Sequence, residues 1–309
     1  MRFEEFLYPS QKGLFEKIRR MYPRTWTCKG KYILVQGDAP VMLVAHLDTV
    51  HKEPVRDICK SDDGNIWMSP QGIGGDDRCG VYTLVSVYEK SPVKPWLLFT
   101  CDEEIGGVGA NAFCDDHAAG KCPVELSAVK FLVEIDRKGR NDAVYYDCAN
   151  DDFEKYITSK GFKTQFGSFS DISVVAPELR VAAVNLSSGY YNAHTTYEHI
   201  NIRHMQSTIR RMIDIVADSV KPETPMYPYI ENVCYGDFGY NFNSADYRTR
   251  LNKIPKDIRF EYECLLDYYS FSTLESVREE MGDAAIPMLY ETEFGEEYDD
   301  DETVVEGFC

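Results

Sequence analysis

The chain has 309 residues, of which 44% are hydrophobic and 13% aromatic, a composition typical of a globular protein with a substantial core. Its formal net charge is −18, from 51 acidic and 33 basic residues. Because binding to a phosphate backbone requires a basic surface, this charge argues against nucleic acid as a general partner. No apolar run has the length needed to cross a bilayer, so we expect no membrane association.

The N-terminus and the cysteines predict where the protein resides. The opening segment, MRFEEFLYPSQKG, has early acidic residues and no apolar signal core, so secretion is not expected. None of the ten cysteines forms a Cys-x-x-Cys pair, and several lie inside apolar runs. Scattered cysteines of this kind are typical of reduced, buried thiols. We therefore predict a cytoplasmic protein.

Short apolar runs alternate with helical patterns along the first two thirds of the chain. The predicted helices cover residues 10–21, 81–89, 110–117, 151–160 and 201–220, the last of them capped by Asn201. The predicted strands cover residues 31–36, 41–45, 66–68, 96–100, 129–135, 144–148 and 181–186. This alternation predicts a three-layer α/β/α fold around a mainly parallel mixed sheet.

The pattern changes near residue 222. A proline-rich stretch over 222–228 is typical of an extended linker, so we predict an α/β domain over 1–221 and a C-terminal extension over 222–309. Within the extension we expect irregular structure over 227–252 and a helix over 257–281, interrupted near 268–272. The tail over 291–302 holds eight acidic residues in twelve, as in solvated or mobile segments.

A histidine and an aspartate stand at the end of the most apolar strand. Side chains alternate along extended backbone, so His46 and Asp48 point the same way. A carboxylate behind an imidazole fixes the tautomer that binds a metal. A strand-end histidine beside a solvated aspartate is the simpler interpretation of this pair alone. The clusters that follow at the ends of other apolar runs favour a metal site.

Those clusters are Gly74-Gly75-Asp76-Asp77, Asp102-Glu103-Glu104, Asp136 and His194. Adjacent side chains diverge, so one of Glu103 and Glu104 can bind metal while the other faces a water molecule. Asp76, held by glycine-rich backbone at the start of a helix, can place one oxygen on each of two metals. Each piece also has an ordinary interpretation: a helix cap, a solvated acidic turn, or a surface pair between His194 and Glu198.

Two hydrolytic metals need a bridging carboxylate, ligands on each side and a base for the water between them. The clusters supply all of these in combination. Mixed imidazole and carboxylate ligands are typical of zinc, with cobalt or manganese as replacements. For the other histidines singled out, a structural role is the better interpretation: His51, His117 and His204.

The combination of HLDTV, GGDDRCG, DEEIGGVGA, EID and AHTTYEHI, spread over residues 31–220, resembles the clan of co-catalytic zinc exopeptidases. That clan includes bacterial zinc aminopeptidases, carboxypeptidase G-like and peptidase T-like enzymes, and tetrahedral aminopeptidases. The resemblance implies two metal sites, whose ligands are His46 and Asp136 for one, Glu104 and His194 for the other, and Asp76 as the bridge.

The resemblance also assigns the remaining roles. Glu103 would be the general base and acid, and Asp48 would orient His46. The bridging aspartate of the family lies four residues before a glycine, which here is Gly80, and the peptide bond after that aspartate is usually cis. Asp136 and His194 are separated by 58 positions, and His46 and Asp76 by 30. These gaps are too short for the inserted domains of some relatives, so we expect the compact form.

The resemblance predicts a metallopeptidase that cleaves next to a chain end, with aminopeptidase action as the first choice and a homo-oligomer possible. Gly189, Tyr190 and Tyr191 precede the last ligand and are predicted to line the substrate pocket, although tyrosines there could equally serve packing. The basic residues after Asp136 could hold a substrate carboxylate, which would favour carboxypeptidase or dipeptidase action. A solvated basic turn is the better interpretation of that stretch: Arg137, Lys138 and Arg140.

Three other functions remain open at this point. A deacylase or amidohydrolase acting on N-acyl amino acids would use the same metals and base. A non-catalytic binding protein could retain the fold, but the completeness of the ligand set argues against it. A cysteine hydrolase that uses Cys79 or Cys101 with a histidine is the weakest alternative.

Overall fold

The structure is a computed structural model that describes residues 1–148, 150–165, 167, 169–230, 253–265 and 271–294. The chain divides into two compact units, Met1–Ser244 and Ala245–Cys309. The boundary predicted after residue 221 stays a prediction.

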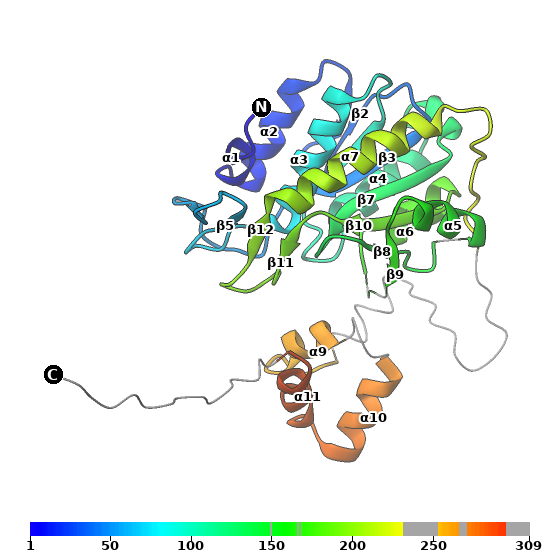
Figure 1. Cartoon of the computed structure of the whole chain (residues 1–309). Coiled ribbons are helices and arrows are strands. Elements are labelled where there is room, and N and C mark those ends of the chain that lie inside the picture. Colours follow the sequence, from blue (N-terminus) through cyan, green and yellow to red (C-terminus); the bar gives the residue numbers. More distant parts are fainter. Residues whose placement is uncertain (149, 166, 168, 231–252, 266–270, 295–309) are drawn as a thin grey trace. The chain divides into compact units, whose positions relative to one another are not determined.

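An eight-stranded mixed sheet forms the centre of the first unit, in the order β1-β2-β6-β3-β7-β10-β8-β9 (Figure 1). Its strands are β1 (Thr25–Cys28), β2 (Tyr32–Val35), β3 (Val41–His46), β6 (Trp96–Thr100), β7 (Phe131–Arg137), β8 (Asp142–Val144), β9 (Lys163–Gln165) and β10 (Ala183–Ser187). The four central strands, β6, β3, β7 and β10, are parallel, whereas β2 and β8 run antiparallel to them. The predicted mainly parallel sheet is therefore confirmed.

Helices cover both faces of the sheet because its central strands are apolar on both sides. Every residue of β3 and β6 is buried, which requires cover above and below. The helices in the described residues of this unit are α1 (Glu4–Leu7), α2 (Gln11–Met21), α3 (Gly75–Lys90), α4 (Val108–Ala118), α5 (Asp151–Ser159), α6 (Ile172–Leu179) and α7 (Ile202–Ser219), with a 3₁₀ turn η1 (Val124–Ala128). Helices α1, α2, α3, α5 and α7 pack on one face, and α4, α6 and η1 on the other. The three-layer architecture is confirmed.

A second, smaller sheet joins two distant stretches of the chain. Strands β4 (Cys59–Lys60) and β5 (Ile66–Met68) form the predicted hairpin, and β5 pairs with β12 (His199–Asn201). Strand β12 in turn pairs with β11 (Tyr190–Tyr191). This antiparallel sheet fixes the segment around residue 194 against the segment around residue 67.

Three parts of the prediction need correction or addition. The strand predicted over 144–148 is wrong, since β8 ends at Val144. Tyr146 and Asp147 have φ values of 47° and 60°, in the left-handed region, which an extended strand does not allow. Helix α6 was not predicted, and it contains Pro177, a residue that normally argues against a helix interior. Strands β1 and β9 were also missed; both are short, β1 is mostly half-buried and β9 is exposed.

The stretch predicted as a linker, 222–228, makes contacts within the first unit. The Tyr227 N–H donates to the Lys130 carbonyl oxygen at 2.9 Å, and the Ala182 N–H donates to the Tyr227 oxygen at 2.8 Å. The Tyr227 ring is buried and lies 5.0 Å, centroid to centroid, from Phe153. This stretch is therefore hydrogen-bonded to the ends of two sheet strands.

Three short helices lie in the part of the second unit that the structure describes: α9 (Arg259–Leu265), α10 (Phe271–Met281) and α11 (Ala285–Phe294). Buried residues of these helices and of the segment before α9 form one cluster: Ile254, Ile258, Tyr262, Leu265, Leu274 and Ile286. The helix predicted over 257–281 corresponds to α9 and α10, and the predicted interruption falls mostly on 266–270, which lie outside the described residues. Most of the predicted irregular stretch, 227–252, and of the acidic tail, 291–302, lies outside the described residues. In the described part of the chain, no helix combines the length and apolarity needed to span a bilayer.

The cap of α7 provides a test of the fold. The Asn201 side chain accepts a hydrogen bond from the His204 N–H at 3.1 Å, as predicted. Replacing Asn201 with Ala should lower the free energy of unfolding by about 1 kcal/mol, because one N–H at the start of the helix loses its acceptor. Urea unfolding followed by circular dichroism measures this. Asn201→Asp keeps the acceptor and should stay close to wild type; equal losses in both variants would contradict the capping role.

Candidate metal centre

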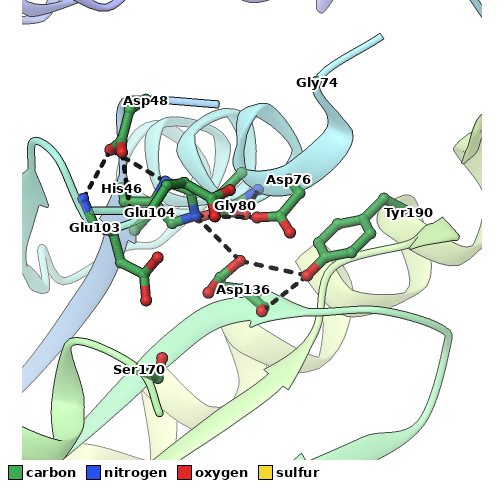
Figure 2. A network of polar contacts seen from close by, with 12 residues as sticks. His46, Asp48, Gly74, Asp76, Gly80, Glu103, Glu104, Asp136, Ser170 and Tyr190 are labelled. Atoms are coloured by element: carbon green, nitrogen blue, oxygen red, sulfur yellow. Dashed lines mark hydrogen bonds and ion pairs between the residues drawn. The ribbon is translucent and has the colours of Figure 1, made fainter. Parts of the chain in front are cut away.

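The carboxyl ends of three adjacent parallel strands bring acidic and imidazole side chains together (Figure 2). His46 is the last residue of β3, Asp136 lies near the end of β7, and Glu103 and Glu104 follow β6. Side chains at this edge of neighbouring parallel strands lie close together, which is where ligands of such sheets bind. The predicted convergence of these residues is thus a consequence of strand order.

Asp76 lies between the two imidazoles. Its Oδ1 is 3.0 Å from His46 Nε2, and its Oδ2 is 3.2 Å from His194 Nε2. Each oxygen of this one carboxylate therefore faces a different histidine, as a bridging ligand requires. Asp77 instead caps the regular part of α3, which begins after the non-helical residues Asp76 and Asp77; its Oδ1 accepts from the Gly80 N–H at 2.9 Å. The Asp76–Asp77 peptide bond is cis, as the resemblance predicted.

The other candidate ligands complete two groups around Asp76. Asp136 Oδ1 lies 3.5 Å from His46 Nε2, and Glu104 Oε2 lies 3.1 Å from His194 Nε2. Three sets of side chains have ligand atoms within 4.8 Å of one another, a spacing that could hold a metal ion: His46–Asp76–Asp136, His46–Glu103–Glu104 and Asp76–Glu104–His194. All five predicted ligands and Glu103 belong to these sets.

The pKa values of these side chains indicate a site suited to cations. Burial and then the Asp76 carboxylate raise the pKa of Asp136 to about 8, and burial is the main reason that the pKa of Glu104 is raised. Although burial lowers it, hydrogen bonds to Asp76 and Glu104 raise the pKa of His194 to about 12. Buried carboxylates that crowd together hold protons unless cations replace them. Imidazole and carboxylate donors in this arrangement therefore fit divalent metal ions.

Asp48 holds the loop that carries both glutamates. Its Oδ1 accepts from the Glu103 N–H and its Oδ2 from the Glu104 N–H, both at 3.1 Å. Its Oδ1 also lies 3.3 Å from His46 Nδ1, but without the orientation of a hydrogen bond. Asp48 thus lies beside His46, and its predicted role in orienting that ring stays a prediction. It fixes the main chain of Glu103 and Glu104.

Two further residues that the sequence did not single out support the site. Gln11 donates to Asp102 Oδ1 at 2.8 Å and accepts from the Asp102 N–H at 3.1 Å, immediately before Glu103. Asn185 accepts from the Asp136 N–H at 2.8 Å. An amide side chain carries no charge or metal-ligand signature, so only its position in the fold shows this role.

Glu198 was also missed. The sequence offered only a surface pair with His194 as an ordinary interpretation of this residue, but Glu198 is fully buried and contacts His51 instead, Oε2 to Nε2 at 2.5 Å. It also accepts main-chain N–H groups of Gly74 and Asp76, both at 2.9 Å. His51 is therefore part of the surroundings of the site. The other two histidines given a structural role pair elsewhere, His117 with Glu178 and His204 with Tyr191.

Glu103 lies beside the proposed ligands, but no imidazole is as close to its carboxylate as His194 is to that of Glu104. Figure 2 shows its carboxylate turned toward the same space as Asp136. Burial raises the pKa of Glu103 well above its ordinary value, the direction expected for a carboxylate that takes and returns a proton near neutral pH. This position is compatible with the predicted role as general base.

The three predicted substrate-contacting residues occupy different surroundings. Tyr190 is buried, and its hydroxyl donates to the Asp136 carbonyl oxygen at 3.1 Å (Figure 2). Gly189 has a φ of +101°, and a Cβ there would lie 2.6 Å from the Met205 nitrogen. Tyr191 is partly buried and stacks on His199, with ring centroids 5.2 Å apart. Their contact with substrate stays a prediction.

Comparison with known proteins identifies the fold. No protein-family model and no curated protein sequence matches this chain. Among solved structures, aminopeptidase PepT from Bacillus cereus matches with a TM-score of 0.54 at 13% identity, over 71% of this chain and 97% of that one. A tripeptidase from Staphylococcus aureus matches with a TM-score of 0.52 at 13% identity, over 70% and 96%. The TET1 peptidase of Pyrococcus horikoshii, which can assemble into a tetrahedron or an octahedral shell, matches with a TM-score of 0.51 at 12% identity, over 69% and 97%. The fold is therefore that of these peptidases, as the sequence motifs predicted.

Asp76 gives a direct test of the centre. Because it is the one carboxylate within 3.2 Å of both imidazoles in the described part of the chain, Asp76→Asn should lower the divalent metal bound per chain by at least about half. Metal analysis by mass spectrometry after dialysis measures this. Asp62→Asn changes an exposed loop carboxylate and should bind as much metal as wild type. Unchanged metal content in Asp76→Asn would contradict a bridging role.

Proposed function

We propose that this protein is a metal-dependent exopeptidase, in the first place an aminopeptidase, that hydrolyses the peptide bond next to the end of its substrate. The observation that carries the proposal is the position of Asp76 between His46 and His194, with Glu103 beside them. The fold shared with aminopeptidases and a tripeptidase supports it.

The site would hold two divalent ions, with zinc as the first choice and cobalt or manganese as replacements. His46 and Asp136 would bind one ion, Glu104 and His194 the other, and Asp76 both. When bound, such ions lower the pKa of a water molecule and polarise a carbonyl group. Six acidic side chains gather here around two histidines, so a pair of divalent cations would balance most of the charge: Asp48, Asp76, Asp77, Glu103, Glu104 and Asp136.

The chain's own residues supply the proton transfer. Glu103 takes a proton from the water molecule as the water oxygen attacks the scissile carbonyl. Glu103 then returns this proton to the leaving amine. Asp48 keeps Glu103 in place through its main-chain N–H. Tyr190 donates a hydrogen bond to the Asp136 carbonyl oxygen, which holds the main chain of this residue beside His46. Glu103 and Asp136 are half-buried, which reduces their contact with bulk water and strengthens their interactions.

The geometry of the site disfavours some of the alternative functions and leaves others open. A deacylase of N-acyl amino acids or a dipeptidase would use the same residues, so the substrate decides between them. A cysteine hydrolase is disfavoured because burial raises the pKa of Cys101 to about 12 and that of Cys79 well above its ordinary value, which leaves both thiols protonated. A binding protein would not need Glu103 beside a complete ligand set.

Other features bear on where and how the protein acts. The eight cysteines that the structure describes are free, which supports a reducing, cytoplasmic environment. The TET1 peptidase forms large assemblies, so a homo-oligomer is part of the proposal. A catalytic domain over 1–221 and a C-terminal extension of unassigned role over 222–309 remain our proposed division.

Replacing the proposed base separates chemistry from metal binding. Glu103→Gln keeps the shape of the side chain but cannot take a proton, so the turnover number should fall about 10²- to 10⁴-fold, while metal content stays near that of wild type. Steady-state hydrolysis of aminoacyl substrates and metal analysis measure the two effects. Glu125→Gln, an exposed glutamate in η1, is the control. Activity of Glu103→Gln close to wild type would reject the assignment.

Metal removal and a substrate panel distinguish the alternatives. A chelator should abolish hydrolysis and Zn²⁺ should restore it, whereas a thiol-alkylating reagent should leave the initial rate unchanged. The panel compares free aminoacyl amides, dipeptides, longer peptides and N-acyl amino acids. Aminopeptidase action predicts that acetylating the substrate amine removes hydrolysis. Cleavage of N-acyl amino acids alone would instead identify a deacylase.

A further inference from the structure

A single buried carboxylate connects the segments that carry three of the proposed ligands. Glu198 Oε1 accepts the Asp76 N–H at 2.9 Å, and Oε2 accepts the Gly74 N–H at 2.9 Å. His51 Nε2 lies 2.5 Å from the same Oε2. Glu198 has no exposed surface, so these three contacts take the place of water. A buried carboxylate requires such partners.

The loop that ends at Asp76 is rich in glycine. Gly72 and Gly74 have φ values of +83° and +63°, and Gly75 follows. Glycine leaves the main chain many conformations, so fixing this loop has a large entropic cost. A Cβ on Gly72 would lie 2.1 Å from His51 Nδ1, and a Cβ on Gly75 would lie 3.2 Å from Glu198 Oε1. The glycines thus let the main chain approach His51 and Glu198 closely.

Glu198 and His51 are close in the chain, or hydrogen-bonded, to three of the proposed metal ligands. Glu198 lies four residues after His194, and its partner His51 lies five residues after His46. Glu198 also accepts a hydrogen bond from the N–H of Asp76 itself. A shift of Glu198 would therefore move Asp76 relative to both imidazoles. Because metal affinity depends on the placement of all ligands together, the groups behind the ligands affect it strongly.

We propose that Glu198, together with His51, is a positioning residue that places Asp76 between the two histidines and thereby sets the affinity of the site for its cations. The inference rests on the metal centre of the proposed function. It does not depend on which bond the protein hydrolyses.

Glutamine at position 198 tests this because of its hydrogen-bonding groups. The carboxylate accepts two main-chain N–H groups, one on each oxygen. A glutamine has one acceptor oxygen and one NH₂ donor, so either orientation places its NH₂ against an N–H. The variant keeps the volume of the side chain but cannot hold both Gly74 and Asp76.

The experiment titrates metal-free protein with Co²⁺ and follows its visible absorption, with calorimetry as a second measurement. Glu198→Gln should bind Co²⁺ about 10- to 100-fold more weakly than wild type. The matched control is Glu178→Gln, which removes the carboxylate of another histidine–glutamate pair, His117–Glu178, 2.7 Å apart and away from the site. Circular dichroism verifies that each variant is folded at the temperature used.

A second pair of variants addresses His51 and serves if Glu198→Gln does not fold. His51→Phe keeps a ring over Gly72 but removes the donor to Glu198, and should weaken Co²⁺ binding several-fold. His51→Gln restores an N–H donor and should recover part of the affinity. Recovery in the second variant is not expected from a loss of packing alone.

The outcomes separate this inference from the proposed function. Wild-type Co²⁺ affinity in folded Glu198→Gln, or in His51→Phe, would overturn the positioning role. Failure of the wild-type protein to bind Co²⁺ would overturn it as well. A wild-type protein that binds Co²⁺ but hydrolyses no substrate of the panel would refute the exopeptidase proposal, and weakened binding in Glu198→Gln would still support the inference.

Discussion

The defining feature of the site is a group of carboxylates that lie close together at one edge of the sheet. Asp76, Asp136, Glu103 and Glu104 meet where three parallel strands end, with His46 and His194 among them. Repulsion between these carboxylates, and their removal from water, raises the pKa of Asp136 to about 8. Such an arrangement is costly without positive charge and becomes favourable when divalent cations are present. The chemistry that we propose follows from this need for cations.

Each proposed carboxylate ligand is held through its main chain by another polar side chain. Asp48 binds the N–H groups of Glu103 and Glu104, Asn185 binds that of Asp136, and Glu198 binds that of Asp76. A partner at the main-chain N–H does not occupy a carboxylate oxygen; at Asp136, the Tyr190 hydroxyl also lies 3.4 Å from Oδ1. Rigid placement of ligands in this way is what a preorganised site requires.

The late part of the chain enters the site through the small sheet. Strand β12 pairs with β5, and the loop before β12 carries His194 at one end and Glu198 at the other. His194 has a φ of 65°, a conformation that non-glycine residues seldom adopt. The contacts of Glu198 with Gly74 and Asp76 then connect this loop to the start of α3. Two stretches more than 100 residues apart are thereby joined at the bridging carboxylate.

The sequence by itself determined the sheet and the chemistry of the ligands. Short apolar runs such as those of β3 and β6 indicated buried strands, and the carboxylates and imidazoles at their ends could be recognised by residue type. The strand predicted over 144–148 was wrong because left-handed residues end β8 early, which no local pattern announced. Only the tertiary structure revealed Gln11, Asn185 and Glu198, since a supporting residue is defined by the N–H group it meets across the fold. For the same reason the sequence could not pair His51 with a glutamate 147 residues away.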